Sequence, residues 1–395
     1  MIFLSEAAKL EKWIIEQRRV LHRIPEHGNK EFYTSAHICK TLSELGLQPV
    51  QILDTAVIAD LKGAIPGPMV ALRADMDALP IQECTELPFA SAHSGMMHAC
   101  GHDMHMAAVL GVAKLLSRYQ SQLPGTVRLL FQPDEEVDGG AERMIQEGCL
   151  DGVQAIFGAH VRPELPLGCI AIREGAFYAA SNPFIIRIFG KTAHGAEPQN
   201  GSDAIVAGAQ IVSALQTLIT RRMNPITPAV ITVGSFHAGT QNNVIADEAV
   251  LKGILRTYGQ ENREFLVQAT THLVHNIATA MGVHAEISFQ WGYPGICNDK
   301  ACTTLVQTTA ETLFGAENVL FPAPQTMTSE DFGYYQQKVP GCFYHIGVAS
   351  KAPLHSGHFL PDEKALPIMT ALHAQVAWNT IAQLNVLSNS DISPD

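Results

Sequence analysis

The sequence of 395 residues is poor in several features that mark particular classes of protein. Only 16% of its residues are charged and 7% are aromatic, and its formal net charge is −12. Lysine and arginine are scattered, so no basic surface is available for the phosphates of nucleic acids or of an anionic membrane. No uninterrupted apolar run approaches the ~20 residues that span a bilayer. We therefore expect neither a nucleic-acid partner nor a membrane partner.

Cysteine is present but is not arranged for cross-linking. The eight cysteines are widely spaced and include no Cys-X-X-Cys pair, which is typical of reduced thiols. The N-terminal stretch has no basic region before its short apolar start and soon reaches Glu6 and Lys9, unlike a secretory signal. With 47% hydrophobic residues, the composition predicts a well-buried cytoplasmic protein of two or three domains.

Strand-like runs and helical periodicities alternate over residues 1–180. They predict buried strands at 56–61, 69–75, 126–133 and 153–161, and helices at 8–22, 34–45, 104–118 and 140–147. Such alternation is typical of an α/β domain with a mostly parallel sheet.

The order of elements changes in residues 181–291. The patterns predict strand 183–189, helix 203–221, strands 229–236 and 249–257, helix 261–281 and strand 284–291. This β-α-β-β-α-β order is ferredoxin-like. The alternation of helix and strand patterns seen in residues 1–180 then resumes, with a helix at 300–314, a strand at 342–348 and a helix at 363–383. We therefore predict an α/β domain of residues 1–180 and 292–395, interrupted by a smaller inserted domain of residues 181–291.

Side chains that can bind metals gather next to the predicted strands. They occur in "RADMDALP" (73–80), "HACGHDMH" (98–105), "QPDEEVDGG" (132–140), "GAHV" (158–161) and "PLHSGHF" (353–359). Sites form where the carboxyl ends of parallel strands meet, so these side chains are expected to lie together.

Cys100 and His102 form the densest of these signals. A thiolate and an imidazole one residue apart can face one ion, and Zn, Mn and similar ions accept sulfur, nitrogen and oxygen donors. Glu135 and Glu136 are adjacent, so one carboxylate can bind metal while the other holds an attacking water. Taken singly, each signal also fits an ordinary polar loop or a solvated turn.

Two further histidines complete a set of donors from separate strand ends. His160 ends "AIFGAH", and His355 stands in "LHS", with His358 as the alternative to His355. Each histidine alone also fits a structural role. Cysteine, glutamate and three histidines together suffice for two ions that share a bridging ligand.

These segments resemble, in their order and spacing, the amidohydrolase branch of the aminoacylase/carboxypeptidase clan of dinuclear metallohydrolases. This branch includes hippurate hydrolases, auxin-conjugate hydrolases and bacterial N-acyl-amino-acid amidohydrolases. The resemblance extends from "RRVLHRIPE" (18–26) to "LPDEKAL" (360–366). It implies a metallohydrolase domain interrupted by a lid and dimerisation domain. It also implies hydrolysis of an N-acyl amino acid to a carboxylic acid and an amino acid.

The resemblance implies roles for the metal-seeking residues. Two divalent ions, Mn, Zn, Co or Ni, would be bridged by Cys100 and held further by His102, Glu136, His160 and His355. Glu135 would be the general base. Other branches of the clan carry His at the position of Arg73 and Asp at that of Cys100. These departures put in doubt a role for Asp75, which is kept with Asp103 as a candidate for supporting the ligands.

The inserted domain contains a second set of candidates. The resemblance implies that His194 reaches the active site of a partner subunit and stabilises the oxyanion, which would make a homodimer the active unit. It implies that Asn243 and Arg256 hold the α-carboxylate of the substrate, for which a planar guanidinium is suited. Glu330 in "TSEDF" is a further candidate for lining the pocket.

Two alternative functions remain at this point. One is a dipeptidase or carboxypeptidase on the same scaffold, distinguished by turnover of peptides in place of simple N-acyl amino acids. The other is a non-catalytic metal-dependent binding protein. Loss of Glu135 or of several ligands would favour the binding protein, and none of these residues is lost.

Overall fold

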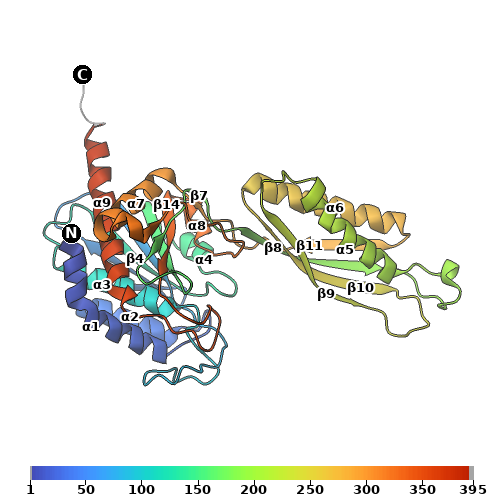
Figure 1. The fold of residues 1–395 in the computed structure, drawn as a ribbon, viewed down its shortest axis with the longest axis horizontal. Helices are drawn as coiled ribbons and strands as arrows, with labels where there is room; N and C mark the ends of the chain where they lie inside the picture. The colour runs from blue at the N-terminus through green and yellow to red at the C-terminus, as the bar shows by residue number, and fades with distance from the viewer. Residues whose placement is uncertain (1, 391–395) are drawn as a thin grey trace. The chain divides into compact units, whose positions relative to one another are not determined.

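The chain passes between two units in the computed structural model, which describes residues 2–390 (Figure 1). The larger unit comprises the chain up to Gly175, Cys297–Pro324 and the chain from Asp331 onward. The smaller unit comprises Ala176–Ile296 and Gln325–Glu330. Nothing in the sequence predicts the short second segment, which is joined to the smaller unit through backbone contacts such as the N–H of Ala179 with the carbonyls of Thr326 and Thr328.

The larger unit contains an eight-stranded mixed sheet. Its strands in spatial order are β1 (Val50–Ile52), β2 (Ala56–Lys62), β4 (Thr126–Gln132), β3 (Met69–Asp75), β5 (Val153–Arg162), β14 (Gly341–Gly347), β6 (Ile170–Ala171) and β13 (Val319–Leu320). The neighbouring pairs β4–β3, β3–β5 and β5–β14 are parallel, which confirms the predicted α/β class with its mostly parallel sheet. The carboxyl ends of these four strands therefore meet at one edge.

Strand β2 departs from the parallel arrangement, because it runs antiparallel to β4. Only residues 63–68 connect β2 to β3. A parallel crossover needs a dozen or more residues, so this short connection excludes a parallel pair of consecutive strands.

Helix α3 (His102–Ser117) positions the metal-seeking groups. All of its residues except Lys114 and Ser117 are buried, as expected of a helix that is apolar on every side. It packs against α1 (Ile2–Arg23) and α9 (Ala365–Ser390), and the three helices lie side by side in Figure 1.

Gly101 precedes α3 with φ 85, and a Cβ there would lie 2.5 Å from a methyl of Val161. Only glycine therefore allows α3 to begin this close to β5.

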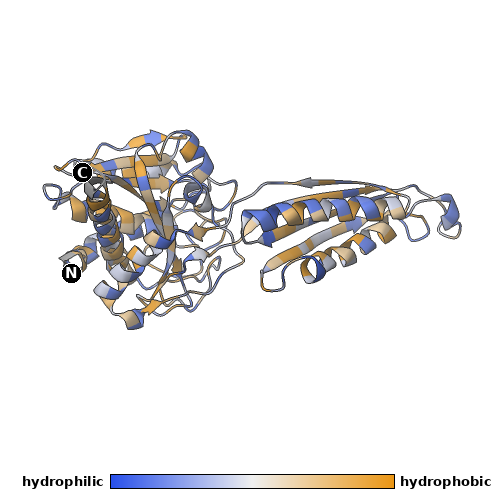
Figure 2. Ribbon diagram, turned by 90° about the horizontal axis from the view of Figure 1, so that it is seen from above, coloured by the Kyte–Doolittle hydropathy of each residue, from blue (hydrophilic) through white to orange (hydrophobic). Residues whose placement is uncertain are grey.

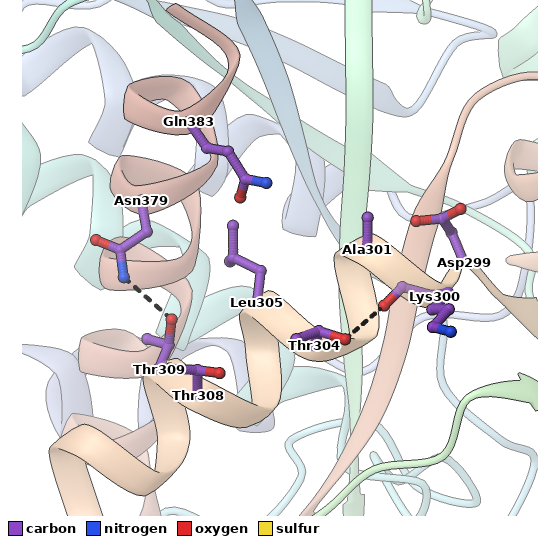
Figure 3. A pocket seen from close by; sticks show the side chains of 9 residues that line it. All are labelled: Asp299, Lys300, Ala301, Thr304, Leu305, Thr308, Thr309, Asn379 and Gln383. Carbon is purple, nitrogen blue, oxygen red and sulfur yellow. Dashed lines mark hydrogen bonds between the residues drawn. The ribbon is translucent and has the colours of Figure 1, made fainter. Parts of the chain in front are cut away.

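The remaining elements of the larger unit are short or lie at its surface. They are α2 (Phe32–Glu44), α4 (Ala141–Gln146), α7 (Lys300–Phe314), η2 (Ala316–Asn318), α8 (Gly333–Gln336) and β12 (Cys297–Asn298), which pairs with β7 (Gly175–Ala176). An open groove of about 660 Å³ follows α7 and α9 (Figure 3). Its lining is mostly threonine and amide side chains, among them Thr309, which accepts a hydrogen bond from Asn379 at 3.0 Å. None of the predicted site residues lines this groove.

The smaller unit has a four-stranded antiparallel sheet in the order β11-β8-β10-β9. The strands are β8 (Ala180–Phe189), β9 (Ala229–Ala238), β10 (Glu248–Thr257) and β11 (His284–Phe289), and the chain also forms η1 (Pro198–Asn200), α5 (Ala204–Arg221) and α6 (Gln260–Ala280). The sequence of β8, α5, β9, β10, α6 and β11 is the predicted β-α-β-β-α-β order.

The two helices of the smaller unit are amphipathic, and both show hydrophilic and hydrophobic bands in Figure 2. In α5, buried Ala207, Ile211, Leu215 and Leu218 recur at helical spacing and join the core of this unit. Among residues 2–390, α5 alone is long and apolar enough to cross a membrane by length and composition. Its core-facing side chains are those of a helix packed within a folded domain.

Candidate metal centre

The five predicted ligands converge in the larger unit. Their donor atoms form overlapping groups, each with all members within 4.8 Å of one another. The groups relevant here are Cys100 with His102 and His160, Cys100 with Glu136 and His355, and His102 with Glu135 and Glu136. Cys100, His102 and Glu136 each belong to two of these groups, so the groups share donors, as two ions with a bridging ligand would require.

Individual distances describe a compact cluster of donors. Cys100 Sγ lies 3.3 Å from His160 Nε2, and His355 Nε2 lies 3.2 Å from Glu136 Oε1. His102 Nε2 lies 3.9 Å from the same Glu136 oxygen. His355 is exposed and the other four are buried or nearly so. Among the described residues, no cluster of metal-binding groups includes His358, so the geometry favours His355 of the two alternatives.

The ring orientations of two ligand histidines are set by backbone carbonyls. His160 Nδ1 lies 2.8 Å from the carbonyl oxygen of Val161, and His102 Nδ1 lies 2.9 Å from that of Asp77. A carbonyl oxygen only accepts, so each Nδ1 carries a hydrogen and each Nε2 is the ring nitrogen left for a metal ion. Metal-binding histidines are oriented in the same way.

The donor set fits divalent ions. His102 Nε2 is buried and has no hydrogen-bond partner, and buried Glu136 Oε1 has only the His355 imidazole nearby, at 3.2 Å. Leaving such atoms unpaired costs about 1–3 kcal/mol each, a cost that a bound cation would remove. A lone pair on imidazole, a carboxylate oxygen and a thiol sulfur are donors that Mn, Zn, Co and Ni accept. These residues could therefore hold two ions.

Electrostatics also favours positive charge in the cluster. Burial raises the pKa of the Cys100 thiol well above its ordinary value, and the charges of Glu136 and Glu135 add to this effect. Burial opposes protonation of His102, yet Asp75 and Asp77 raise its pKa to about 10. The pocket thus attracts a proton in the place where a metal cation would bind.

Asp75, whose role the sequence left in doubt, contacts residues that adjoin the cluster. It is fully buried and accepts hydrogen bonds from Arg73 Nη1 and His105 Nδ1, both at 2.6 Å. His105 Nε2 in turn accepts the backbone N–H of Val161 at 3.0 Å. His105 thus accepts from the N–H of Val161, and His160 donates to the carbonyl of the same residue. Through Val161, Asp75 is connected to the orientation of His160.

Asp103 does not support a ligand directly, so this expectation is corrected. Its Oδ2 accepts from Arg18 Nε at 2.7 Å and lies 2.9 Å from His22 Nδ1. Consecutive helical residues point about 100° apart, which turns Asp103 away from the side that His102 occupies. Its contacts instead join the first turn of α3 to α1.

Asp77 and Asp331 are contributors that sequence reasoning missed. Asp77 Oδ2 accepts the backbone N–H of Glu136 at 2.9 Å, and its Oδ1 lies 3.2 Å from His102 Nδ1. Asp331 accepts from Arg73 Nη2 at 2.8 Å and from the amide of Gln132. The two-residue spacing of Asp75 and Asp77 at a strand end was the available signal for Asp77. Asp331 directly follows Glu330 in "TSEDF", and this segment was the available signal for Asp331.

The candidates of the smaller unit form two separate groups. His194 and Asn243 lie together in loops, where the Gly195 N–H donates to the Asn243 carbonyl at 2.7 Å. Arg256 stands near the far end of β10, beside Ser181 and Val230. From Glu248 to Arg256 the strand rises about 26 Å.

The segment "NNVIAD" lies outside the strands of the smaller unit. Asn243 lies in the loop between β9 and β10, because the ladder of β10 begins only at Glu248. Arg256 is half-buried, and its Nη1 is buried without a hydrogen-bond partner. Glu330, the remaining candidate, is buried in the second segment of this unit.

Comparison with known proteins places the chain in a family. The sequence pattern of "Peptidase family M20/M25/M40" matches residues 71–379. The N-acetyl-L-cysteine deacetylase of Bacillus subtilis (strain 168) is 43% identical over 358 residues, which are 90% of this chain and 85% of that protein. Thermostable carboxypeptidase 1 of Saccharolobus solfataricus is 36% identical over 383 residues, 94% of this chain and 96% of the relative.

A solved structure agrees in fold as well as in sequence. It is that of a dinuclear metal binding peptidase from the M20 family of Bacillus subtilis, with a TM-score of 0.85 and 37% identity. The match covers 95% of this chain and 99% of the other. This protein therefore belongs to peptidase family M20/M25/M40. Membership confirms the resemblance found in the sequence and the expectation of a metal-dependent hydrolase.

Proposed function

We propose that this protein is an amidohydrolase that cleaves N-acyl amino acids into a carboxylic acid and a free amino acid. The observation that carries the proposal is the convergence of Cys100, His102, Glu136, His160 and His355 beside the carboxylate of Glu135. The deacetylase relative, named for N-acetyl-L-cysteine, supports this substrate class.

Each side chain of the cluster has a defined part in this reaction. Cys100, His102, Glu136, His160 and His355 would hold two divalent ions, whose positive charge acidifies water and polarises an amide carbonyl. Glu135 removes a proton from the attacking water and later delivers it to the leaving nitrogen. The donors fit Mn, Zn, Co or Ni, and the native ion is left to metal analysis.

Recognition of the substrate is assigned to the smaller unit. Arg256 would bind the α-carboxylate, and its unpaired Nη1 is a donor suited to that group. Asn243 is the second candidate for this contact. Asn243 precedes β10 and Arg256 lies near its far end, with roughly 26 Å of strand between Glu248 and Arg256. One carboxylate therefore cannot touch Asn243 and Arg256 of a single chain.

A homodimer accounts for this separation. The partner subunit would supply His194 and Asn243, which lie together, while Arg256 would come from the chain that binds the metals. His194 would donate to the oxyanion of the tetrahedral intermediate, a contact worth about 2.7–4 kcal/mol. We also place the protein in the cytoplasm, where its eight free cysteines would stay reduced.

A carboxypeptidase or dipeptidase activity is the second candidate, favoured by the carboxypeptidase relative. One assay separates the two. The purified protein, loaded separately with Mn, Zn, Co or Ni, is offered a panel of N-acyl amino acids and matched dipeptides. Preferential release of amino acid from the N-acyl compounds supports the proposal. Turnover of dipeptides alone would contradict it.

A further inference from the structure

The turn that carries Glu135 and Glu136 is held by a segment that the mechanism does not use, residues 28–31. Glu31 is fully buried within this segment. Its Oε1 accepts the backbone N–H of Asp134 at 3.0 Å and that of Asn29 at 3.1 Å. Its Oε2 accepts the hydroxyl of Thr55 at 2.9 Å. A buried carboxylate is thus used to hold the backbone next to Glu135.

Asp134 has a left-handed backbone conformation, with φ 62. For a residue other than glycine this conformation costs about 1–2 kcal/mol, so it persists only where the surroundings enforce it. Here Asn29 Nδ2 and Arg143 Nη2 donate to Asp134 Oδ2 at 2.6 and 3.0 Å. The N–H of Gly139 donates to the Asp134 carbonyl at 2.9 Å. Together with Glu31, these contacts hold a conformation that the chain would otherwise avoid.

Gly28 allows the close approach that these contacts require. A Cβ at this position would lie 2.1 Å from Asp134 Oδ1 and 3.2 Å from its Cα. Any side chain at residue 28 would therefore push the turn away.

The other side of Glu135 is held in the same manner. Asp77 Oδ2 accepts the backbone N–H of Glu136 at 2.9 Å, as Glu31 does for Asp134. The N–H groups before and after Glu135 are thus bound by two separate buried carboxylates. A short turn that is fixed at both ends leaves little freedom for the residue between them.

We propose that Glu31 and Gly28 are positioning residues that fix the Asp134 turn and so hold the Glu135 carboxylate where it takes a proton from water. The inference rests on the proposed function, in which Glu135 is the general base. A displacement of about 1 Å at a reacting group can lower a rate about 100-fold, so the turn is a sensitive point.

Three variants of the full-length, metal-loaded protein test this role. Glu31→Ala removes the acceptor of the Asp134 N–H, and we expect kcat to fall about 100-fold with KM changed little. Metal content after dialysis should stay normal, because Asp77 still holds Glu136. Glu31→Gln should recover most of kcat, since its amide oxygen can accept both N–H groups.

Glu26→Ala is the matched control, because buried Glu26 accepts from Thr34 and Tyr33 at the start of α2. It should lower thermal stability and leave kcat unchanged.

A double-mutant cycle tests Gly28 independently. Gly28→Ala should lower kcat, because the added methyl meets the Asp134 carboxylate. Asp134→Gly removes that carboxylate and adopts φ 62 without strain, so the double variant should be more active than the product of the single effects. Strictly additive effects would show that residue 28 does not act through Asp134.

Amide hydrogen exchange of residues 132–137 gives a readout that needs no substrate. Exchange at Asp134 should be faster in Glu31→Ala and unchanged in Glu26→Ala. Native kcat in Glu31→Ala, or a loss of kcat that excess metal ion reverses, would overturn the inference and leave the proposed function intact. If the native protein hydrolyses no N-acyl amino acid, the proposed function fails. Unchanged exchange in Glu31→Ala would then separately overturn the positioning role.

Discussion

The two units differ in how many of their histidines are buried. The larger unit buries His22, His98, His102, His105, His160, His345 and His373, whereas the five histidines of the smaller unit, His194, His237, His272, His275 and His284, are all exposed. Burying an imidazole is unfavourable unless its nitrogens are used. In the larger unit, most of these rings bind a carboxylate, a carbonyl or a neighbouring donor of the metal centre.

The difference indicates two ways of building a functional site. The five candidate ligands all lie within the larger unit, because the start of α3, strand β5 and the loops after β4 and β14 supply their donor atoms. In the smaller unit, His194 and Asn243 stand on loops, and Arg256 lies far along a strand from them. In the proposed homodimer, the partner subunit would bring these three side chains to one substrate.

Removal of the Cys100 thiol should abolish the binding of both metal ions. Cys100→Ala is expected to lose bound metal and all activity, because its sulfur belongs to two of the three donor groups. The fold should persist, since α3 and its apolar contacts are unchanged. Metal analysis after dialysis, with circular dichroism as the control for folding, checks this expectation. A variant with normal metal content would remove Cys100 from the ligands.

A mixture of two weak variants should be more active than either alone. Glu135→Gln should keep its metals and lose about 10²–10⁴ in kcat, the scale of a lost general base. His194→Ala should also lower kcat without loss of metal. In a mixed dimer one site lacks both groups and the other has both, so activity should return toward one productive site per dimer. Confirmed subunit exchange without recovery would mean that His194 does not act across subunits.

Selectivity for a free carboxylate should depend on Arg256. A hydrogen bond to a charged group contributes about 1.5–3 kcal/mol, so Arg256→Ala should reduce the preference for N-acyl amino acids over their amides by about 10–100-fold. The rate with the amides themselves should change less. Arg187→Ala, which removes an exposed arginine from β8, provides the control. An unaltered preference in Arg256→Ala would remove it from the carboxylate site.

Acid should destabilise the protein through the buried histidines of the larger unit. Burial, and then the charge of His105, lowers the pKa of His373 to about 3, and the ring lies 2.8 Å from the Tyr344 hydroxyl. A depressed histidine pKa gives stability that is complete above about pH 6.5 and is lost as the pH falls, because only the unfolded chain takes up the proton. The loss should be roughly 2 kcal/mol by pH 5.

Thermal unfolding across this pH range checks the prediction. His373→Gln should flatten the decline between pH 6.5 and 5, whereas His272→Gln on the exposed face of α6 should leave it unchanged. Equal slopes in the native protein and in His373→Gln would show that the ring is already accessible to protons.

Several features of this protein could be predicted because they depend on local pattern. Apolar periodicity identified α3, the strand that precedes the Glu135 turn and the strand that carries His160. The β-α-β-β-α-β order of the smaller unit follows from alternating short patterns. The five ligands were recognisable because metal chemistry restricts the residue types and because the ends of parallel strands meet at one edge. The antiparallel direction of β2 was readable in principle from its short connection to β3.

The sequence by itself determined the elements, the fold class and the donor types, since these depend on neighbouring residues and on side-chain chemistry. Only the tertiary structure decided which groups support the donors. Asp331 reaches Arg73 across 258 positions of sequence, and Glu31 reaches the backbone of Asp134 across 103. It also turned Asp103 toward α1 and separated Asn243 from Arg256. Such pairings depend on how distant segments pack, and no local pattern encodes them.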